Sequence, residues 1–168
     1  MFRRPSVIAL AAVIVLAAGA AIGWAVGSSQ RAEPVVREAL AQSSKVRGVK
    51  DRTLALSRVT IRPGATIPLH HHPGTQVSYI DRGTLTYSVE TGAVKVMRGA
   101  SDQKPKLVRR IEAGETGRIK AGSWIVEQPN EKHHAANRGD GRVVIYLSTL
   151  FPKGAPPSIP DEPPAATR

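Results

Sequence analysis

Short segments of alternating polarity, separated by glycine and proline, fill residues 51–151 of the chain. Residues 84–90, TLTYSVE, are typical, because Leu85, Tyr87 and Val89 alternate with threonine and serine as on a half-buried strand. No segment of this region has the 3.6-residue period of an amphipathic helix. The pattern therefore predicts an all-β domain over residues 51–151, built as an antiparallel barrel or sandwich.

The flanking segments read differently. The expected strands are 53–61, 75–80, 84–90, 123–128, 133–137 and 142–151. Residues 92–113 are looser and basic, which indicates an inserted hairpin or a long loop. Residues 28–50 read as a linker that can hold a short helix around Val35–Ala41. Residues 152–168 contain six prolines and are predicted to form an extended, mostly disordered tail.

The N-terminal segment, residues 1–27, is predicted to be a membrane anchor or a signal peptide. Arg3 and Arg4 precede Val7–Val26, which is twenty residues long and carries no charge. A helix of that length can span a bilayer core of about 30 Å. The alternative is a long signal peptide cleaved near Ala25–Ser29. Either one places the domain outside the cytoplasm by the positive-inside rule.

Charge and composition limit which molecules and ions the protein is expected to bind. Lysine and arginine outnumber aspartate and glutamate by 24 to 13, a formal net charge of +11. Nucleic acid is not expected, because aromatic residues make up only 4% of the chain and no zinc-finger spacing occurs. The absence of cysteine excludes disulfides and thiolate ligands. A metal site would therefore need histidine, carboxylate or amide ligands.

The histidines favour such a site. His70 and His72 are two residues apart, so on a strand both side chains lie on one face while His71 points away. Gln76 follows across a Pro-Gly turn and can direct its amide oxygen to the same point. The pair at 133–134 stands on a second strand-like segment. Imidazoles from two distant strands are a way to hold a first-row metal without cysteine.

Two motifs support this interpretation. Residues 64–83 resemble the first motif of the cupin superfamily, G-x5-H-x-H-x3,4-E-x6-G, apart from one substitution. The residues that follow its spacing are Gly64, His70, His72, Gln76 (in place of Glu) and Gly83. Residues 122–137 resemble the second motif, G-x5-P-x-G-x2-H-x3-N. Its spacing is kept by Gly122, His133 and Asn137, while Pro129 is displaced by one residue and Glu131 replaces the inner Gly.

The resemblance implies a double-stranded β-helix barrel with an N-terminal export or anchor helix. It further implies one divalent metal ion, with Fe, Mn, Zn, Ni and Cu all open, held by His70, His72, Gln76 and His133. Counting from Gly122 and Asn137 selects His133 as the ligand, whereas counting from Pro129 would select His134. We expect His133 to face the interior, with a bulge near 127–129 absorbing the displaced proline.

Other residues next to the motifs are weaker candidates. Tyr79, Tyr87 and Trp124 either line a pocket or pack in the core. Glu127 either orients a ligand imidazole, acts as a base, or is an exposed or capping residue. His134 is expected at the rim of the site.

The expected function is that of an exported or membrane-tethered cupin that binds a divalent metal and a small, anionic molecule. Because Gln76 is neutral, the full +2 charge of the ion would remain to attract an anion. Oxygenase-type or isomerase-type activity is one reading. A non-catalytic metal or small-molecule binding or sensing domain is the alternative, and an empty structural barrel is a third. Since cupins often pair through barrel strands, a homodimer is also expected.

Overall fold

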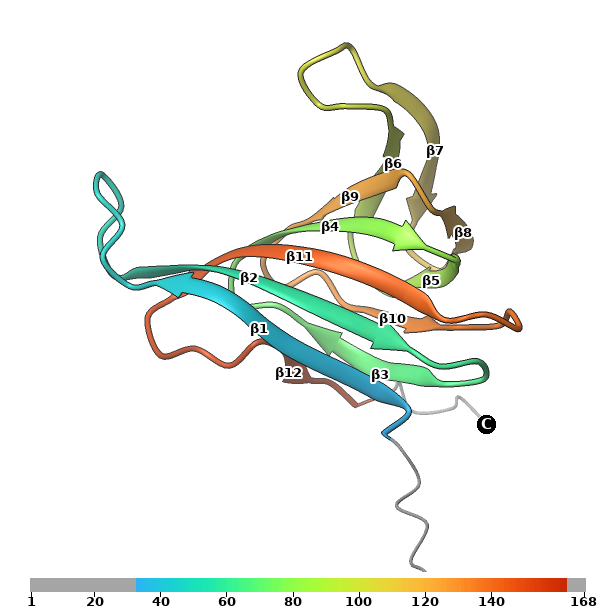
Figure 1. The fold of residues 1–168 in the computed structure, drawn as a ribbon, viewed down its shortest axis with the longest axis horizontal. Coiled ribbons are helices and arrows are strands. Elements are labelled where there is room, and N and C mark those ends of the chain that lie inside the picture. The colour runs from blue at the N-terminus through green and yellow to red at the C-terminus, as the bar shows by residue number, and fades with distance from the viewer. Residues whose placement is uncertain (1–32, 163–168) are drawn as a thin grey trace, which may run out of the picture. The chain divides into compact units, whose positions relative to one another are not determined.

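The computed structural model describes residues 33–162, and the regular secondary structure in that range is entirely β-strand (Figure 1). The prediction of an all-β domain is confirmed. The described residues include no helix long and apolar enough to cross a membrane. The expected anchor or signal segment, residues 1–27, lies outside them.

Two antiparallel sheets make up the domain. The seven-stranded sheet has the order β1 (Val35–Ser43), β2 (Arg52–Ile61), β11 (Val143–Pro152), β4 (Thr75–Arg82), β9 (Ser123–Glu127), β6 (Ala93–Arg98), β7 (Lys106–Glu112). The five-stranded sheet has the order β12 (Ile159–Pro160), β3 (Thr66–His71), β10 (His133–Ala136), β5 (Thr84–Val89), β8 (Thr116–Lys120). Neighbours within a sheet are mostly distant in sequence, which is the topology of a double-stranded β-helix.

The chain crosses from one sheet to the other at Gly83, between β4 and β5. Gly83 has a φ of 79°, which is in the left-handed region that favours glycine. A Cβ at this position would also lie 2.7 Å from the carbonyl oxygen of Arg142. The last glycine of the first motif is therefore required by both backbone conformation and space.

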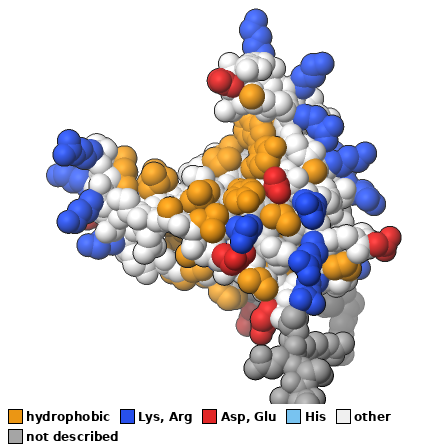
Figure 2. Space-filling model, in the orientation of Figure 1, with side chains coloured by type: hydrophobic (Ala, Val, Ile, Leu, Met, Phe, Trp, Pro, Cys, Tyr) orange, Lys and Arg blue, Asp and Glu red, His pale blue; other side chains and the backbone are white. Residues whose placement is uncertain are grey.

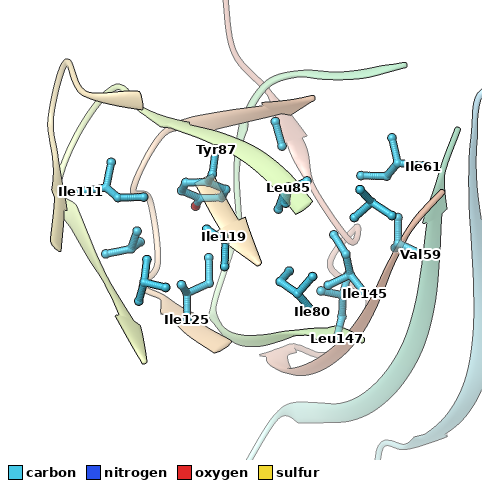
Figure 3. Packing of buried hydrophobic residues seen from close by; sticks show 14 of the residues in the cluster. Val59, Ile61, Ile80, Leu85, Tyr87, Ile111, Ile119, Ile125, Ile145 and Leu147 are labelled. Atoms are coloured by element: carbon cyan, nitrogen blue, oxygen red, sulfur yellow. The ribbon is translucent and has the colours of Figure 1, made fainter. Parts of the chain in front are cut away.

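The core lies between the sheets (Figure 3). Its side chains come from alternate positions of the strands, as along β11, where Val143, Ile145 and Leu147 are at most 5% exposed and the residues between them are half-buried. Figure 3 shows Ile80 and Ile125 from the larger sheet among these residues. Inward and outward residues thus alternate along the strands, as strand geometry requires.

Strand β1 corrects the expected linker and its helix. Residues 35–43 pair with β2 from Val35↔Ile61 to Ser43↔Leu54, with a bulge between Ala39 and Ala41. The edge of β2 offers backbone donors and acceptors that an extended segment can satisfy and a helix cannot. Pairing with β2 therefore overrides the weak helical pattern of this stretch.

The C-terminal segment is also partly ordered. Within the expected tail, Ile159 and Pro160 pair with His71 and His70 of β3 as the short strand β12. Proline is tolerated here because β12 is an edge strand. The expected hairpin at 92–113 is present as β6 and β7, joined to the sheet through β9.

The outer face of the larger sheet is unusually apolar. Figure 2 shows hydrophobic side chains gathered over this face. Those that are 38% exposed or more on its strands include Val36, Leu40, Leu54, Leu56, Val77 and Tyr79. Strand alternation alone therefore does not tell which face of this sheet is the core, because both faces carry apolar residues.

Asn137 joins three segments next to the site. Its side-chain amide donates to the carbonyl oxygens of Ile61 (3.0 Å) and Gly141 (2.7 Å), and its Oδ1 accepts from the Gly139 amide (3.0 Å). Asn137→Ala would leave these buried groups unpaired, so we expect it to lower the free energy of unfolding by about 2–4 kcal/mol. Denaturant unfolding measures this. Gln103→Ala, at an exposed loop position, is the control and should change stability by less than about 0.5 kcal/mol; equal effects of the two would contradict the role of Asn137.

Candidate metal centre

Three histidines meet at one end of the core. His70 lies on β3, His72 directly follows it, and His133 opens β10. Cross-strand pairing sets His133 opposite His70. One ring nitrogen from each of the three lies within 4.8 Å of those of the others. The structure therefore brings both motifs to one point.

Of the two neighbours on β10, His133 faces inward. His133 is 3% exposed, whereas His134 is exposed to solvent. The expected bulge near 127–129 is not present. Instead, β9 ends at Glu127 and Pro129 lies in the loop before β10. That loop contains Asn130 at a φ of 65°, and a turn of this kind accommodates an added residue without shifting the strand.

Backbone carbonyls fix the tautomer of all three imidazoles. In each ring Nδ1 lies within hydrogen-bond distance of a carbonyl oxygen, so Nδ1 carries the proton and donates it. The acceptors are Pro68 for His70 (2.8 Å), Pro157 for His72 (2.9 Å) and Glu131 for His133 (3.1 Å). Nδ1 is thereby engaged in each ring, and Nε2 is the nitrogen left to bind a metal.

Burial also keeps two of these rings, His70 and His72, neutral. Burial lowers the pKa of His72 to about 4, and the nearby Glu127 carboxylate only partly opposes that shift. The pKa of His70 is also lowered, chiefly by burial and then by His133. Neutral imidazoles at ordinary pH need no deprotonation before they coordinate a cation.

Gln76 lies beside the histidines with its amide anchored. Its Nε2 is 2.5 Å from Oε2 of Glu127, 3.1 Å from Nε2 of His72 and 3.3 Å from Oγ of Ser78. Its carbonyl oxygen, Oε1, is buried and has no hydrogen-bond partner. An orphaned buried acceptor of this kind fits the expected role of an oxygen ligand.

Glu127 is a buried carboxylate on the wall of the site. It accepts hydrogen bonds from Ser78 (2.6 Å), Tyr87 (2.9 Å) and Gln76, and its Oε1 is 3.3 Å from Nε2 of His133. Burial raises its pKa, but His133, His72 and the hydrogen bonds lower it further, so the net pKa lies below the ordinary value. Glu127 is therefore ionised.

Nitrogen and oxygen atoms that can bind a cation gather at the site. They are a ring nitrogen of each histidine, Oε1 of Gln76 and Oε1 of Glu127. Of these, Oε1 of Gln76 has no hydrogen-bond donor, whereas Glu127 already accepts hydrogen bonds. Cysteine is absent from the chain, and the groups gathered here offer nitrogen and oxygen atoms. The residues present fit a divalent first-row metal.

The histidines open into a cavity of about 190 Å³ between the sheets. Its polar wall includes Ser78, Tyr87 and Glu127, and burial raises the pKa of Tyr87, so the hydroxyl stays protonated. Arg37 and Ser158 also line the cavity. The apolar part of the wall is formed by Val35, Val59, Ile67, Leu85, Ile125, Ala135, Ile145 and Leu147. A small molecule with a polar head and an apolar body suits such a cavity.

Sequence reasoning missed Arg37, which lines this cavity from β1. The residue lies in the segment read as a linker. The sequence signal that could have identified it is the alternation of side chains along an extended strand. On β1, Glu38 faces outward and accepts a hydrogen bond from Arg58 at 2.8 Å, so its neighbour Arg37 faces the cavity. The alternation is informative only if residues 35–43 form a strand, and the sequence alone does not indicate that they do.

Two expected pocket residues lie elsewhere. Tyr79 is 43% exposed and Trp124 pairs with it across β4 and β9, so both belong to the outer face and neither lines the cavity. Side chains alternate on a strand, and it is their neighbours Ser78 and Ile125 that face inward. His71 points away from the histidine cluster and binds Asp161 at 2.6 Å.

Comparisons with known proteins concern the fold. No protein-family model and no curated protein matches the chain. Among solved structures, a cupin 2 domain-containing protein from Halorhodospira halophila matches with a TM-score of 0.50 and 12% identity, over 80% of this chain and 76% of that one. The cupin domain of Cnp3 from Schizosaccharomyces pombe matches with a TM-score of 0.50 and 14% identity, over 77% and 74%. KdgF from Halomonas sp. has a TM-score of 0.47 and 20% identity, over 71% and 83%.

The neighbours on β10 give a direct test of the centre. We expect His133→Ala to weaken Co²⁺ binding at least tenfold, because it removes one Nε2 from the cluster. His134→Ala, whose ring is exposed, should bind Co²⁺ like the wild type. Visible absorption of Co²⁺ during titration measures both affinities. The opposite ranking would move the ligand to His134.

Proposed function

Because this chain has the cupin fold, we propose that it binds a divalent first-row metal through His70, His72, His133 and Gln76, together with a small anionic molecule. The observation that carries the proposal is the set of three imidazoles whose Nδ1 atoms are tied to backbone carbonyls. Their Nε2 atoms are thereby held ready before any ligand arrives. Such preorganisation is typical of binding centres.

Arg37 favours an anionic ligand. It lines both the inner cavity and an outer groove of about 610 Å³, so it stands between the two. Although the residue is partly exposed, burial lowers its pKa, and the Glu127 carboxylate opposes the shift. An arginine keeps its charge in proteins and binds carboxylates through two parallel hydrogen bonds. The apolar wall favours a carboxylate with a hydrocarbon body.

Catalysis is one form of this function. A bound divalent ion would supply positive charge to polarise an oxygen of the ligand. Glu127 and Tyr87 lie on the same wall and can hold or accept a proton. An oxygenase-type or isomerase-type reaction would use such a wall.

One observation favours the non-catalytic alternative. Glu127 already accepts hydrogen bonds from Ser78, Tyr87 and Gln76, which reduces its capacity to act as a base. A carboxylate held in this way suits a permanent binding site, in which metal or ligand is sensed rather than converted.

The proposed location is outside the cytoplasm, with residues 1–27 as a membrane anchor or a cleaved signal peptide. Its support is the sequence alone, namely Arg3 and Arg4 before the uncharged run Val7–Val26.

The ligand proposal is tested with Co²⁺-loaded protein and straight-chain carboxylates from acetate to octanoate, each beside its amide. We expect a carboxylate of this series to bind at least tenfold more tightly than its amide. Arg37→Gln should reduce the preference at least threefold, because it removes the side-chain cation at the cavity and leaves only the Co²⁺ ion to attract the anion. Calorimetry measures both. Arg142→Gln, on the outer face of the sheet, is the control and should keep the preference. Equal affinity of wild-type protein for acids and amides would contradict the proposal.

The location is tested with an alkaline phosphatase fused after Arg168. We expect the fusion to be active, because this reporter folds only outside the cytoplasm. Deleting residues 1–27 should abolish its activity. An inactive full-length fusion, made in normal amount, would overturn the proposed location.

A further inference from the structure

A carboxylate stands opposite the position where the first motif lost one. The motif has Glu where this chain has Gln76. On the neighbouring strand β9, the residue paired with Gln76 across the ladder is Glu127. Both side chains are buried, at 3% and 4% exposure, and both point into the histidine cavity.

The two side chains form one unit. Nε2 of Gln76 donates to Oε2 of Glu127 at 2.5 Å, and Ser78 donates to the same oxygen at 2.6 Å. Oε2 is therefore directed toward β4, the strand that carries Gln76 and Ser78. Oε1 accepts from Tyr87 at 2.9 Å and lies 3.3 Å from Nε2 of His133, the atom we assign to the metal.

The distance between these two atoms fits two ligands of one ion. Nδ1 of His133 faces the carbonyl oxygen of Glu131, so its Nε2 is directed toward the Glu127 carboxylate. Zn²⁺, for example, binds nitrogen and oxygen ligands at about 2.0–2.2 Å, so neighbouring ligand atoms of one ion lie about 3 Å apart. An ion bound at Nε2 of His133 would therefore lie within reach of Oε1 of Glu127.

We propose that Glu127 supplies the negative charge of the metal centre, displaced by one strand from the place the motif gives it, and that Gln76 positions this carboxylate. The inference rests on the metal site of the proposed function. It assigns Oε1 of Glu127 to the cation, as a direct or closely neighbouring anion, and the Gln76 amide to the hydrogen bond that holds Oε2. The centre then carries one negative charge, as the motif would, rather than none.

The reciprocal exchange tests this assignment. Glu127→Gln removes the charge and should weaken Co²⁺ binding 10- to 100-fold, the usual effect of losing a charged partner of a metal centre. The double variant Gln76→Glu/Glu127→Gln returns one carboxylate to the pair on the other strand. We expect it to bind Co²⁺ within about threefold of the wild type.

One further variant separates the charge of Glu127 from its hydrogen bonding. Tyr87→Phe removes one hydrogen bond to Oε1 but keeps the charge, so it should weaken binding less than Glu127→Gln. Circular dichroism and thermal melting without metal check that each variant folds. If Glu127→Gln does not fold, the exchanged pair, which keeps one amide and one carboxylate, decides the question.

The outcomes are distinct. Co²⁺ binding by the wild type, weakened by Glu127→Gln and restored by the exchange, supports the inference. Wild-type affinity in Glu127→Gln, or a loss of more than tenfold in a folded exchanged pair, overturns it while leaving the three-histidine site standing. No Co²⁺ binding by the wild type would overturn the proposed function and this inference together.

Discussion

The pairing of β10 with its neighbours is the constraint on which the site depends. β10 lies between β3 and β5, and its register sets His133 opposite His70 on one side and Val89 on the other. A slip of one residue would turn His133 outward and His134 inward. Asn137, just beyond β10, holds the ends of the adjoining segments and so protects that register. The interactions that stabilise the register of β10 therefore also set the positions of the histidine side chains.

Segments outside the barrel core complete the site. Strand β1 brings Arg37 to the cavity, and the C-terminal segment brings the carbonyl of Pro157 to Nδ1 of His72. β12 pairs with the strand that carries His70, which ties that segment down. Without these additions the barrel would keep three imidazoles but lose the fixed tautomer of His72 and the cation at the cavity.

Sequence patterns predicted those features of the fold that depend on neighbouring residues in the chain. Alternation located β2, β4, β5, β9, β10 and β11, and motif spacing chose His133 over His134. β1 and β12 were not predicted, because each is a strand only through pairing with the edge of another strand, β2 or β3. The composition of a segment does not indicate such pairing. Tyr79 and Trp124, expected to line a pocket or to pack in the core, lie on the outer face, because the larger sheet is apolar on both faces. Glu127 was identified as a candidate, but its pairing with Gln76 required the register of β4 and β9.

The same arrangement links ligand binding to folding. Leaving Oε1 of Gln76 buried without a donor costs about 1–3 kcal/mol. The surrounding core tolerates this strain because its aliphatic residues are close to fully buried on both sheets. A cation that binds only the folded chain would relieve the strain and add its own binding free energy to stability.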